Sequence, residues 1–146
     1  HNVAGLKLAE ECKNLDGCKK GEAKITKGYN LPAKFIIHTV SPVFGLENGK
    51  EKEILMNCYI NSFELAKENS IKSIAFPCIG TGCYRFPKDK AAIIATGIAQ
   101  KYINDFEMIL FVCFSELDYK IYQTLIDNNN IQTDVSVNLL KKSYEN

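Results

Sequence analysis

The segment Ile71–Pro87 reads IKSIAFPCIGTGCYRFP, and it decides the fold. Residues 73–76 are apolar and a proline follows them, which is typical of a short buried strand. Gly80 and Gly82 come next, and the segment closes on a proline that suits the first turn of a helix. A strand, a glycine turn and a helix N-terminus together present backbone N–H groups to an anion. The segment therefore predicts a candidate anion site in an α/β protein.

The glycine turn alone does not identify a ligand. A tight connection between strand and helix, without any ligand, explains Gly80-Thr81-Gly82 equally well. The turn is not a P-loop, because no Gly-Lys-Ser/Thr follows, and it lacks the third glycine of the dinucleotide fingerprint. We expect both glycines to adopt backbone conformations that are closed to residues with a Cβ atom.

Length and composition describe an ordinary globular domain. The 146 residues suffice for one domain with a buried core, and 24% of them are charged with a net charge of +1. Because acidic and basic residues are interspersed, nucleic-acid binding is not predicted. No apolar run is long enough to span a bilayer, and residue 1 begins directly in sequence of structured character, so neither a membrane span nor a signal peptide is predicted.

The six cysteines indicate a reducing compartment, which we expect to be the cytoplasm. None of them forms a Cys-x-x-Cys pair, and with two histidines in the chain no metal site is predicted. A disulfide between Cys12 and Cys18 stays open as an alternative.

Hydrophobic periodicity predicts alternating helices and strands along the chain. We expect helices over residues 3–12, 51–69, 88–105 and 116–127, and strands over 21–26, 34–40, 73–76 and 108–114. The strand over 34–40 is expected to be buried. The alternation predicts an α/β fold of three layers, with a mostly parallel central sheet and helices on both faces.

The chain divides into a domain over residues 1–128 and a C-terminal tail over 129–146. In the tail, residues 131–140 alternate apolar and polar side chains. This pattern suggests a strand that covers the sheet edge left open where the first strands of the fold are missing.

Ligands of parallel sheets bind outside the carboxyl ends of the strands. Three loops leave those ends in the predicted fold, over residues 41–50, 79–86 and 114–117. We expect them to line one crevice.

Several segments resemble the macro domain, the ADP-ribose-binding module. The matching residues are GEAKITKGYNLPAK at 21–34 with IIHTV at 36–40, FPCIGTG at 76–82 with Tyr84, Phe86 and Pro87, and the strand 110–113 with Phe114. The similarity runs in order from residue 1 to about residue 127. It is greatest to the branch that removes ADP-ribose from proteins or deacetylates O-acetyl-ADP-ribose.

The resemblance implies a role for each matching residue. The diphosphate and the distal ribose would be bound by Ile79, Gly80, Thr81, Gly82, Cys83, Tyr84 and Arg85, with backbone N–H groups holding the phosphates and Tyr84 covering the ribose. Phe114 would pack near the adenine and its ribose. No cofactor and no metal are implied, and the partner would be ADP-ribose or an ADP-ribosylated protein.

The chain departs from the family pattern at its start and at single residues: Cys83 stands where an aliphatic residue is common, and Ser41 replaces a frequent glycine. Arg85 stands where the family usually has glycine, and we expect its side chain to point to solvent. The family's adenine-reading Asp, its Asn-Ala-Ala-Asn strand and its first glycine-rich loop have no counterpart here, and His1 resembles the histidine that follows that loop. The catalytic residues are therefore unknown, and we expect this chain alone to have little or no hydrolytic activity.

Four readings of function remain open, and one of them is structural: without its first strands the chain would expose a sheet edge and apolar helix faces, which invites pairing or dimerisation. The first is an ADP-ribose-binding macro domain from a protein that hydrolyses ADP-ribosyl groups or O-acetyl-ADP-ribose. The second is a reader of ADP-ribose without turnover, or a truncated form with impaired binding. The third makes Cys83 a nucleophile near a helix N-terminus. The oligomeric state is not predicted.

Overall fold

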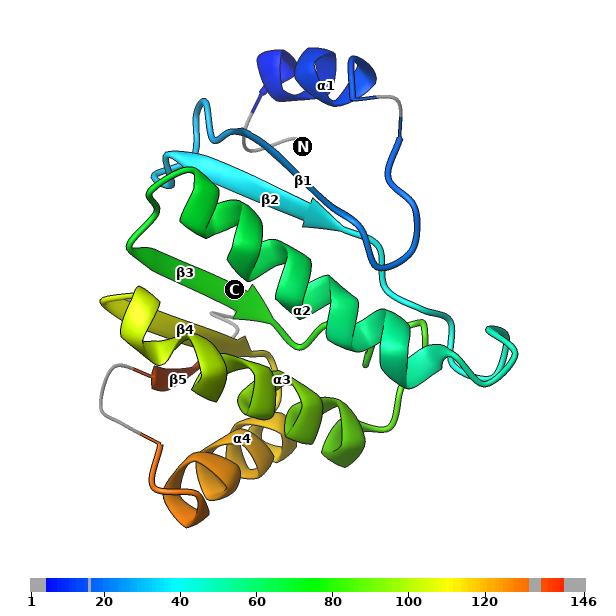
Figure 1. Ribbon diagram of the computed structural model, residues 1–146, viewed down its shortest axis with the longest axis vertical. Helices are drawn as coiled ribbons and strands as arrows, with labels where there is room; N and C mark the ends of the chain where they lie inside the picture. Colours follow the sequence, from blue (N-terminus) through cyan, green and yellow to red (C-terminus); the bar gives the residue numbers. More distant parts are fainter. Residues whose placement is uncertain (1–4, 16, 132–134, 141–146) are drawn as a thin grey trace, which may run out of the picture.

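The computed structural model describes residues 5–15, 17–131 and 135–140. Helices and strands alternate along most of the chain (Figure 1). In chain order they are α1 (Leu6–Lys13), β1 (Ala23–Lys27), β2 (Phe35–Thr39), α2 (Glu51–Glu68), β3 (Ser73–Pro77), α3 (Lys88–Tyr102), a 3-10 turn (Ile103–Asp105), β4 (Met108–Cys113), α4 (Glu116–Asn128) and β5 (Val135–Leu139). The predicted α/β class and the predicted elements are confirmed, with boundaries that differ by a few residues.

The strands form two sheets. In one, β1 and β2 pair antiparallel, with Ile25 opposite Ile37. In the other, β3, β4 and β5 pair in parallel, with Phe76 opposite Phe111. Strands β2 and β3 run in the same direction, but no pairing joins them among the described residues (Figure 1). The single central sheet that we expected is therefore interrupted between these two strands.

Helix α2 holds the two sheets together. On one side the Cys58 thiol donates to the carbonyl of Val40, just beyond β2, at 3.3 Å. On the other side the rings of Tyr59 and Phe63 pack on Phe76 of β3, with centroids 5.1 and 4.9 Å apart. The buried face of α2 therefore spans both sheets, because the neighbouring side chains of Cys58 and Tyr59 reach different strands.

The core lies on the face of the parallel sheet that carries Phe76 and Phe111. Strand β4 alternates exposed or half-buried residues with the buried Ile109, Phe111 and Cys113, as expected for a strand with one face packed on the core. The small residues of α3 let this helix lie close to α2 and α4; those buried are Ala91, Ala92, Ala95 and Ala99.

Two expectations about the strands need correction. The strand over 34–40 is half-exposed rather than buried, with Phe35 39% exposed, because its free edge opens onto a cavity. The tail does form a strand, β5, but it pairs with β4 on the side away from β3. It therefore does not cover the free edge of β3. Val135 and Val137 are buried where β5 packs beside β4 and α4.

Candidate functional site

The glycine loop, residues 78–87, connects β3 to α3 and carries most of the predicted site. Within it, four N–H groups donate to backbone carbonyls: Ile79 to Pro77 at 3.0 Å, Thr81 to Cys78 at 3.5 Å, Arg85 to Gly82 at 3.1 Å, and Phe86 to Gly80 at 2.8 Å. The N–H groups of Gly80, Gly82, Cys83 and Tyr84 have no such partner in the described part of the chain. Most backbone N–H groups in folded proteins donate a hydrogen bond. Four N–H groups without a partner, close together in one exposed loop, therefore form a candidate anion site.

The two glycines of the loop have different roles. Gly80 has φ +84°, and a Cβ atom there would lie 3.0 Å from Ser41 Oγ. Gly82 has no positive φ, and a Cβ atom there would meet nothing within 4 Å. The expectation that both glycines adopt left-handed backbone is therefore correct for Gly80 and wrong for Gly82. Instead, the second left-handed residue of the loop is Arg85, at φ +61°, and its side chain is exposed.

The loop over residues 41–50 lies against the glycine loop. The Phe44 N–H donates to the Tyr84 carbonyl at 2.9 Å, and the Phe44 ring packs edge-on against Phe86 at 5.2 Å. Phe44 also leaves much of its ring exposed next to the half-exposed Tyr84. Two of the three predicted crevice loops are thus in direct contact, and both present aromatic surface.

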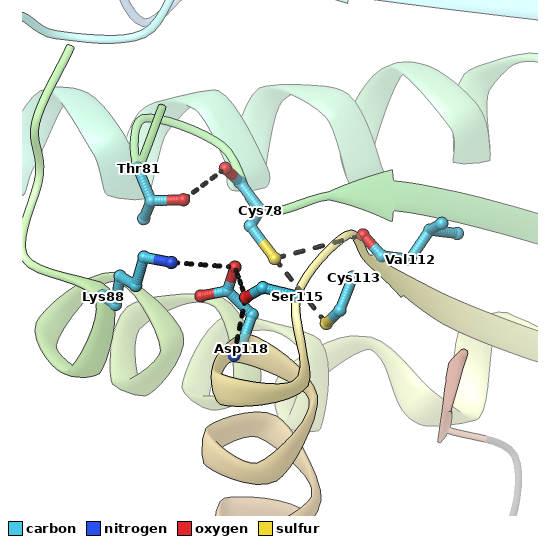
Figure 2. A network of polar contacts seen from close by, with 7 residues as sticks. All are labelled: Cys78, Thr81, Lys88, Val112, Cys113, Ser115 and Asp118. Carbon is cyan, nitrogen blue, oxygen red and sulfur yellow. Dashed lines mark hydrogen bonds and ion pairs between the residues drawn. The ribbon is translucent and has the colours of Figure 1, made fainter. Parts of the chain in front are cut away.

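The third loop joins them through a polar network at the start of α4 (Figure 2). Ser115 caps this helix: its hydroxyl accepts from the Asp118 N–H at 3.1 Å and donates to the Asp118 carboxylate at 2.8 Å. Lys88, the first residue of α3, reaches the same carboxylate at 3.3 Å. Because Asp118 is largely buried and Lys88 follows the glycine loop directly, this ion pair fixes the end of the loop against α4.

The adjacent strand end carries the predicted adenine-side residue. Phe114 follows β4 and is 63% exposed, so its ring is available for stacking on a flat ligand. Its neighbour Cys113 lies 3.7 Å, sulfur to sulfur, from Cys78 at the start of the glycine loop. The structure therefore brings Phe114 to the same end of the sheet as the loop.

A cavity of about 1260 Å³ separates the two sheets. It runs between the free edges of β2 and β3, and one end reaches Ser41, Gly80 and Tyr84 of the candidate site. The predicted crevice residues Thr81, Gly82, Cys83, Arg85 and Phe114 lie outside its lining. We therefore distinguish the candidate anion site, which is on the loop surface, from the larger space between the strands.

Among the described residues that line this cavity, His38 is the only histidine, and none is an aspartate or a glutamate. Its Nε2 is 2.9 Å from Thr26 Oγ1, as expected for a core histidine with a partner. Burial lowers the pKa of His38 below its ordinary value, with a smaller opposing effect from Glu11. The imidazole is thus held in its neutral form by the fold.

The cysteines form no disulfide, and the role of Cys83 as a nucleophile stays a prediction. All six cysteines are free, so the Cys12–Cys18 disulfide is absent, and Cys83 is exposed on the loop. Within the described ranges, no group of three or more His, Cys, Asp or Glu residues is placed to hold a metal ion. Among the same residues, no helix has both the length and the hydropathy needed to cross a membrane.

Comparison with known proteins identifies the family. The family model for the macro domain matches residues 1–95, and the chain belongs to the macro domain family. It is 47% identical over 148 residues to mouse ADP-ribose glycohydrolase MACROD2, an alignment that covers 94% of this chain and 31% of the relative. It is 49% identical over 126 residues to a macro domain-containing protein of Chlorobaculum tepidum, covering 84% of this chain and 73% of the relative.

Solved structures give the same result. The Oceanobacillus iheyensis macrodomain with ADP superposes with a TM-score of 0.80 at 37% identity, covering 89% of this chain and 73% of that chain. The Trypanosoma brucei macrodomain in complex with ADP-ribose superposes with a TM-score of 0.79 at 39% identity, covering 86% and 54%. The macro domain resemblance and fold are thus confirmed. The chain spans about a third of the length of the mouse and human MACROD2 relatives, 31% and 35%.

Sequence reasoning missed three contacts of the site. These are the Lys88–Asp118 ion pair, the Phe44–Phe86 packing and the Cys78–Cys113 contact. Their partners are 30 to 42 residues apart, so no local pattern could reveal them. One signal was readable: Ser115 precedes an acidic helix start, which is the usual pattern of a capped N-terminus.

Proposed function

We propose that the glycine loop binds the diphosphate of ADP-ribose. The observation that carries the proposal is the group of free N–H donors at Gly80, Gly82, Cys83 and Tyr84, on the loop that leads into α3. Hydrogen bonds from such donors to phosphate oxygens are charge-assisted and stronger than neutral ones. The 15-residue helix α3 adds a favourable dipole at its N-terminus.

The rest of the ligand would contact the aromatic surface around the loop. Tyr84, 41% exposed, would cover the distal ribose, and Phe114, 63% exposed, would stack beside the adenine. Ile79 and Thr81 would support the loop rather than bind phosphate, because their N–H groups already donate to backbone carbonyls. Arg85 would remain at the solvent side, since its side chain is exposed and no ion pair involves it among the described residues.

Similarity to proteins named for ADP-ribose supports this choice of ligand. MACROD2 relatives are named ADP-ribose glycohydrolases, and one structural neighbour is a complex with ADP-ribose. For the protein that carries this domain, we propose removal of ADP-ribose from modified proteins or deacetylation of O-acetyl-ADP-ribose, in a reducing, cytoplasmic compartment. ADP-ribosylated proteins would be its partners.

For the chain by itself we propose binding without efficient turnover. Hydrolysis needs a group that activates or positions water, and the Nε2 atom of His38, the only histidine among the cavity-lining residues described, is already bonded to Thr26. Release of ADP-ribose from a mono-ADP-ribosylated protein by residues 1–146 would contradict this part of the proposal.

Isothermal titration calorimetry with ADP-ribose tests the binding proposal. We expect a 1:1 isotherm with a dissociation constant in the micromolar range, which corresponds to about −8 kcal/mol. The variant Gly82→Ala should weaken binding about tenfold, because it adds a Cβ atom to the open loop surface at the residue between the free N–H groups of Gly80 and Cys83.

Gly97→Ala is the matched control. Gly97 lies in α3, and a Cβ atom there also meets nothing within 4 Å, but the position is remote from the loop. Its affinity should equal that of the unaltered chain. Absence of heat with millimolar ADP-ribose would refute the proposal for this chain.

A further inference from the structure

Two thiols lie side by side at the carboxyl ends of β3 and β4. The last pair of residues in the register of these strands is Pro77 opposite Val112, so Cys78 and Cys113 are opposite one another one position further along. Paired residues of parallel strands point to the same face of the sheet. In agreement with this, the two sulfur atoms are 3.7 Å apart and face each other (Figure 2).

The two thiols have different access to solvent. Cys113 is fully buried, whereas Cys78 is half-buried and contributes to the lining of the cavity between the sheets. Burial raises the pKa of both thiols, that of Cys113 to about 12. Because Cys78 lines the cavity and Cys113 is fully enclosed, Cys78 is the sulfur that a small oxidant reaches first, and Cys113 lies behind it to react second.

The other cysteines are arranged differently. Cys58 donates to the Val40 carbonyl, and Cys83 is exposed on the glycine loop. Within residues 5–15, 17–131 and 135–140, Cys78 and Cys113 form the only sulfur-to-sulfur contact found. A thiol pair with one accessible and one buried member is what a reversible dithiol requires, because the second thiol must be in contact when the first is oxidised.

We propose that Cys78 and Cys113 form a redox-convertible dithiol whose disulfide links the base of the glycine loop to the end of β4. With hydrogen peroxide as the oxidant, the Cys78 thiolate attacks one peroxide oxygen, the O–O bond breaks, and a sulfenic acid and hydroxide form. The Cys113 sulfur then attacks the Cys78 sulfur and the S–O bond breaks. The leaving hydroxide takes up the Cys113 proton, so that two thiols and one peroxide give one disulfide and two waters.

The backbone can accommodate this bond. Neighbouring strands lie roughly 4.8 Å apart, and disulfides join Cα atoms separated by roughly 4.4 to 6.8 Å. The sulfur atoms need to approach from 3.7 Å to about 2.0 Å, which rotation of the Cys78 side chain on its loop residue provides. The proposal does not depend on the ligand of the loop.

Peptide mapping tests the proposal. Trypsin releases Cys78 in the peptide 73–85 and Cys113 in the peptide 102–120, but Cys83 shares the first of these. The experiment therefore uses the full chain carrying Cys83→Ser, which removes an exposed thiol outside the pair. The folded protein is treated at micromolar concentration with hydrogen peroxide, the remaining thiols are alkylated in denaturant, and the digest is analysed by mass spectrometry.

We expect a linked peptide whose mass is the sum of the two peptides less two hydrogens, and which separates on reduction with dithiothreitol. Alkylation of Cys113 should fall at least tenfold relative to the untreated protein. The linked peptide should be absent when Cys113→Val is added. Full alkylation of both cysteines after oxidation, or linkage of Cys78 to a cysteine other than Cys113, would overturn the proposal.

Discussion

Replacing Gly80 by alanine should destabilise the domain, whereas the same change two residues later should not. Gly80 has φ +84°, a left-handed conformation that costs an alanine about 1–2 kcal/mol. Its new Cβ atom would also lie 3.0 Å from Ser41 Oγ and 3.5 Å from the Cβ of Phe86. Both neighbours are buried, so neither can move freely.

The magnitude follows from these contacts. Displacing the Ser41 hydroxyl would break its 2.9 Å hydrogen bond to the Pro42 carbonyl, at a net cost of about 1 kcal/mol. Alanine also lowers the conformational entropy of the unfolded chain relative to glycine, which offsets roughly 0.4–1 kcal/mol of this loss of stability. We therefore expect a net loss of about 2 kcal/mol, which lowers the Tm of a 146-residue domain by about 4–8 °C.

Thermal unfolding followed by circular dichroism, with a urea titration for the free energy of unfolding, measures the effect. Gly82→Ala is the control, since position 82 has ordinary backbone and open space around its Cβ direction, and it should stay within about 0.5 kcal/mol of the unaltered chain. Equal destabilisation by the two substitutions, or an unchanged Tm for Gly80→Ala, would refute this account of the loop.

Three further predictions concern the elements around the site. Ser115→Ala should lower stability by about 1 kcal/mol in urea unfolding, because the Asp118 N–H loses its acceptor and the Asp118 carboxylate keeps only Lys88; an unchanged midpoint would show that the cap contributes nothing. Gly97→Ala should raise stability by about 0.5–1 kcal/mol in the same assay, since alanine favours the helix and its Cβ atom meets nothing, and a loss of stability would contradict the open surroundings of α3. The folded state lowers the pKa of His38, so the unfolded chain takes up the proton first as the pH falls. The contribution of His38 to the free energy of unfolding should therefore be fully present above pH 6.5 and decrease as the pH drops from 6.5 toward the folded pKa. His38→Asn should remove this part of the dependence of stability on pH. An identical pH slope in His38→Asn would contradict that assignment.

The sequence sufficed for the helices and strands because each has a clear apolar periodicity. In α3, for example, the apolar spacing selects Ala91, Ala92, Ala95, Ile98, Ala99 and Tyr102 as inward residues; the first five are buried and Tyr102 is half-buried. In α2 the apolar spacing selects Leu65, which is half-buried, but it does not select Tyr59 and Phe63, whose buried rings lie on Phe76. Whether an aromatic residue at the border of an apolar stripe is buried depends on the strand that packs against it. The sequence of the helix carries no information about that strand.

The position of β5 could not be read from its own residues. Alternation of Val135 and Val137 with polar residues predicts a strand, but not the strand with which it pairs. The edges of β3 and β4 offer the same backbone groups, and the helix α4 that precedes β5 places it beside β4. The partner strand of β5 is therefore set by the topology of the fold rather than by the local sequence pattern.

The candidate site was predictable in place but not in detail. The order of strand, glycine turn and helix located the loop, because this order fixes where N–H groups point. Which N–H groups remain free depends on turn hydrogen bonds such as Arg85 to Gly82 and on the contact of Phe44 with Tyr84. Those contacts follow from the folded loop and from a second loop about 40 residues earlier in the chain.

The most direct test of the central claim is an NMR titration of the ¹⁵N-labelled chain with ADP-ribose. The account predicts that the amide signals of Gly80, Gly82, Cys83 and Tyr84 shift most, as their free N–H groups gain phosphate oxygens, while the internally bonded amide of Arg85 shifts less. Saturating shifts located elsewhere, with these four amides unmoved, would contradict it.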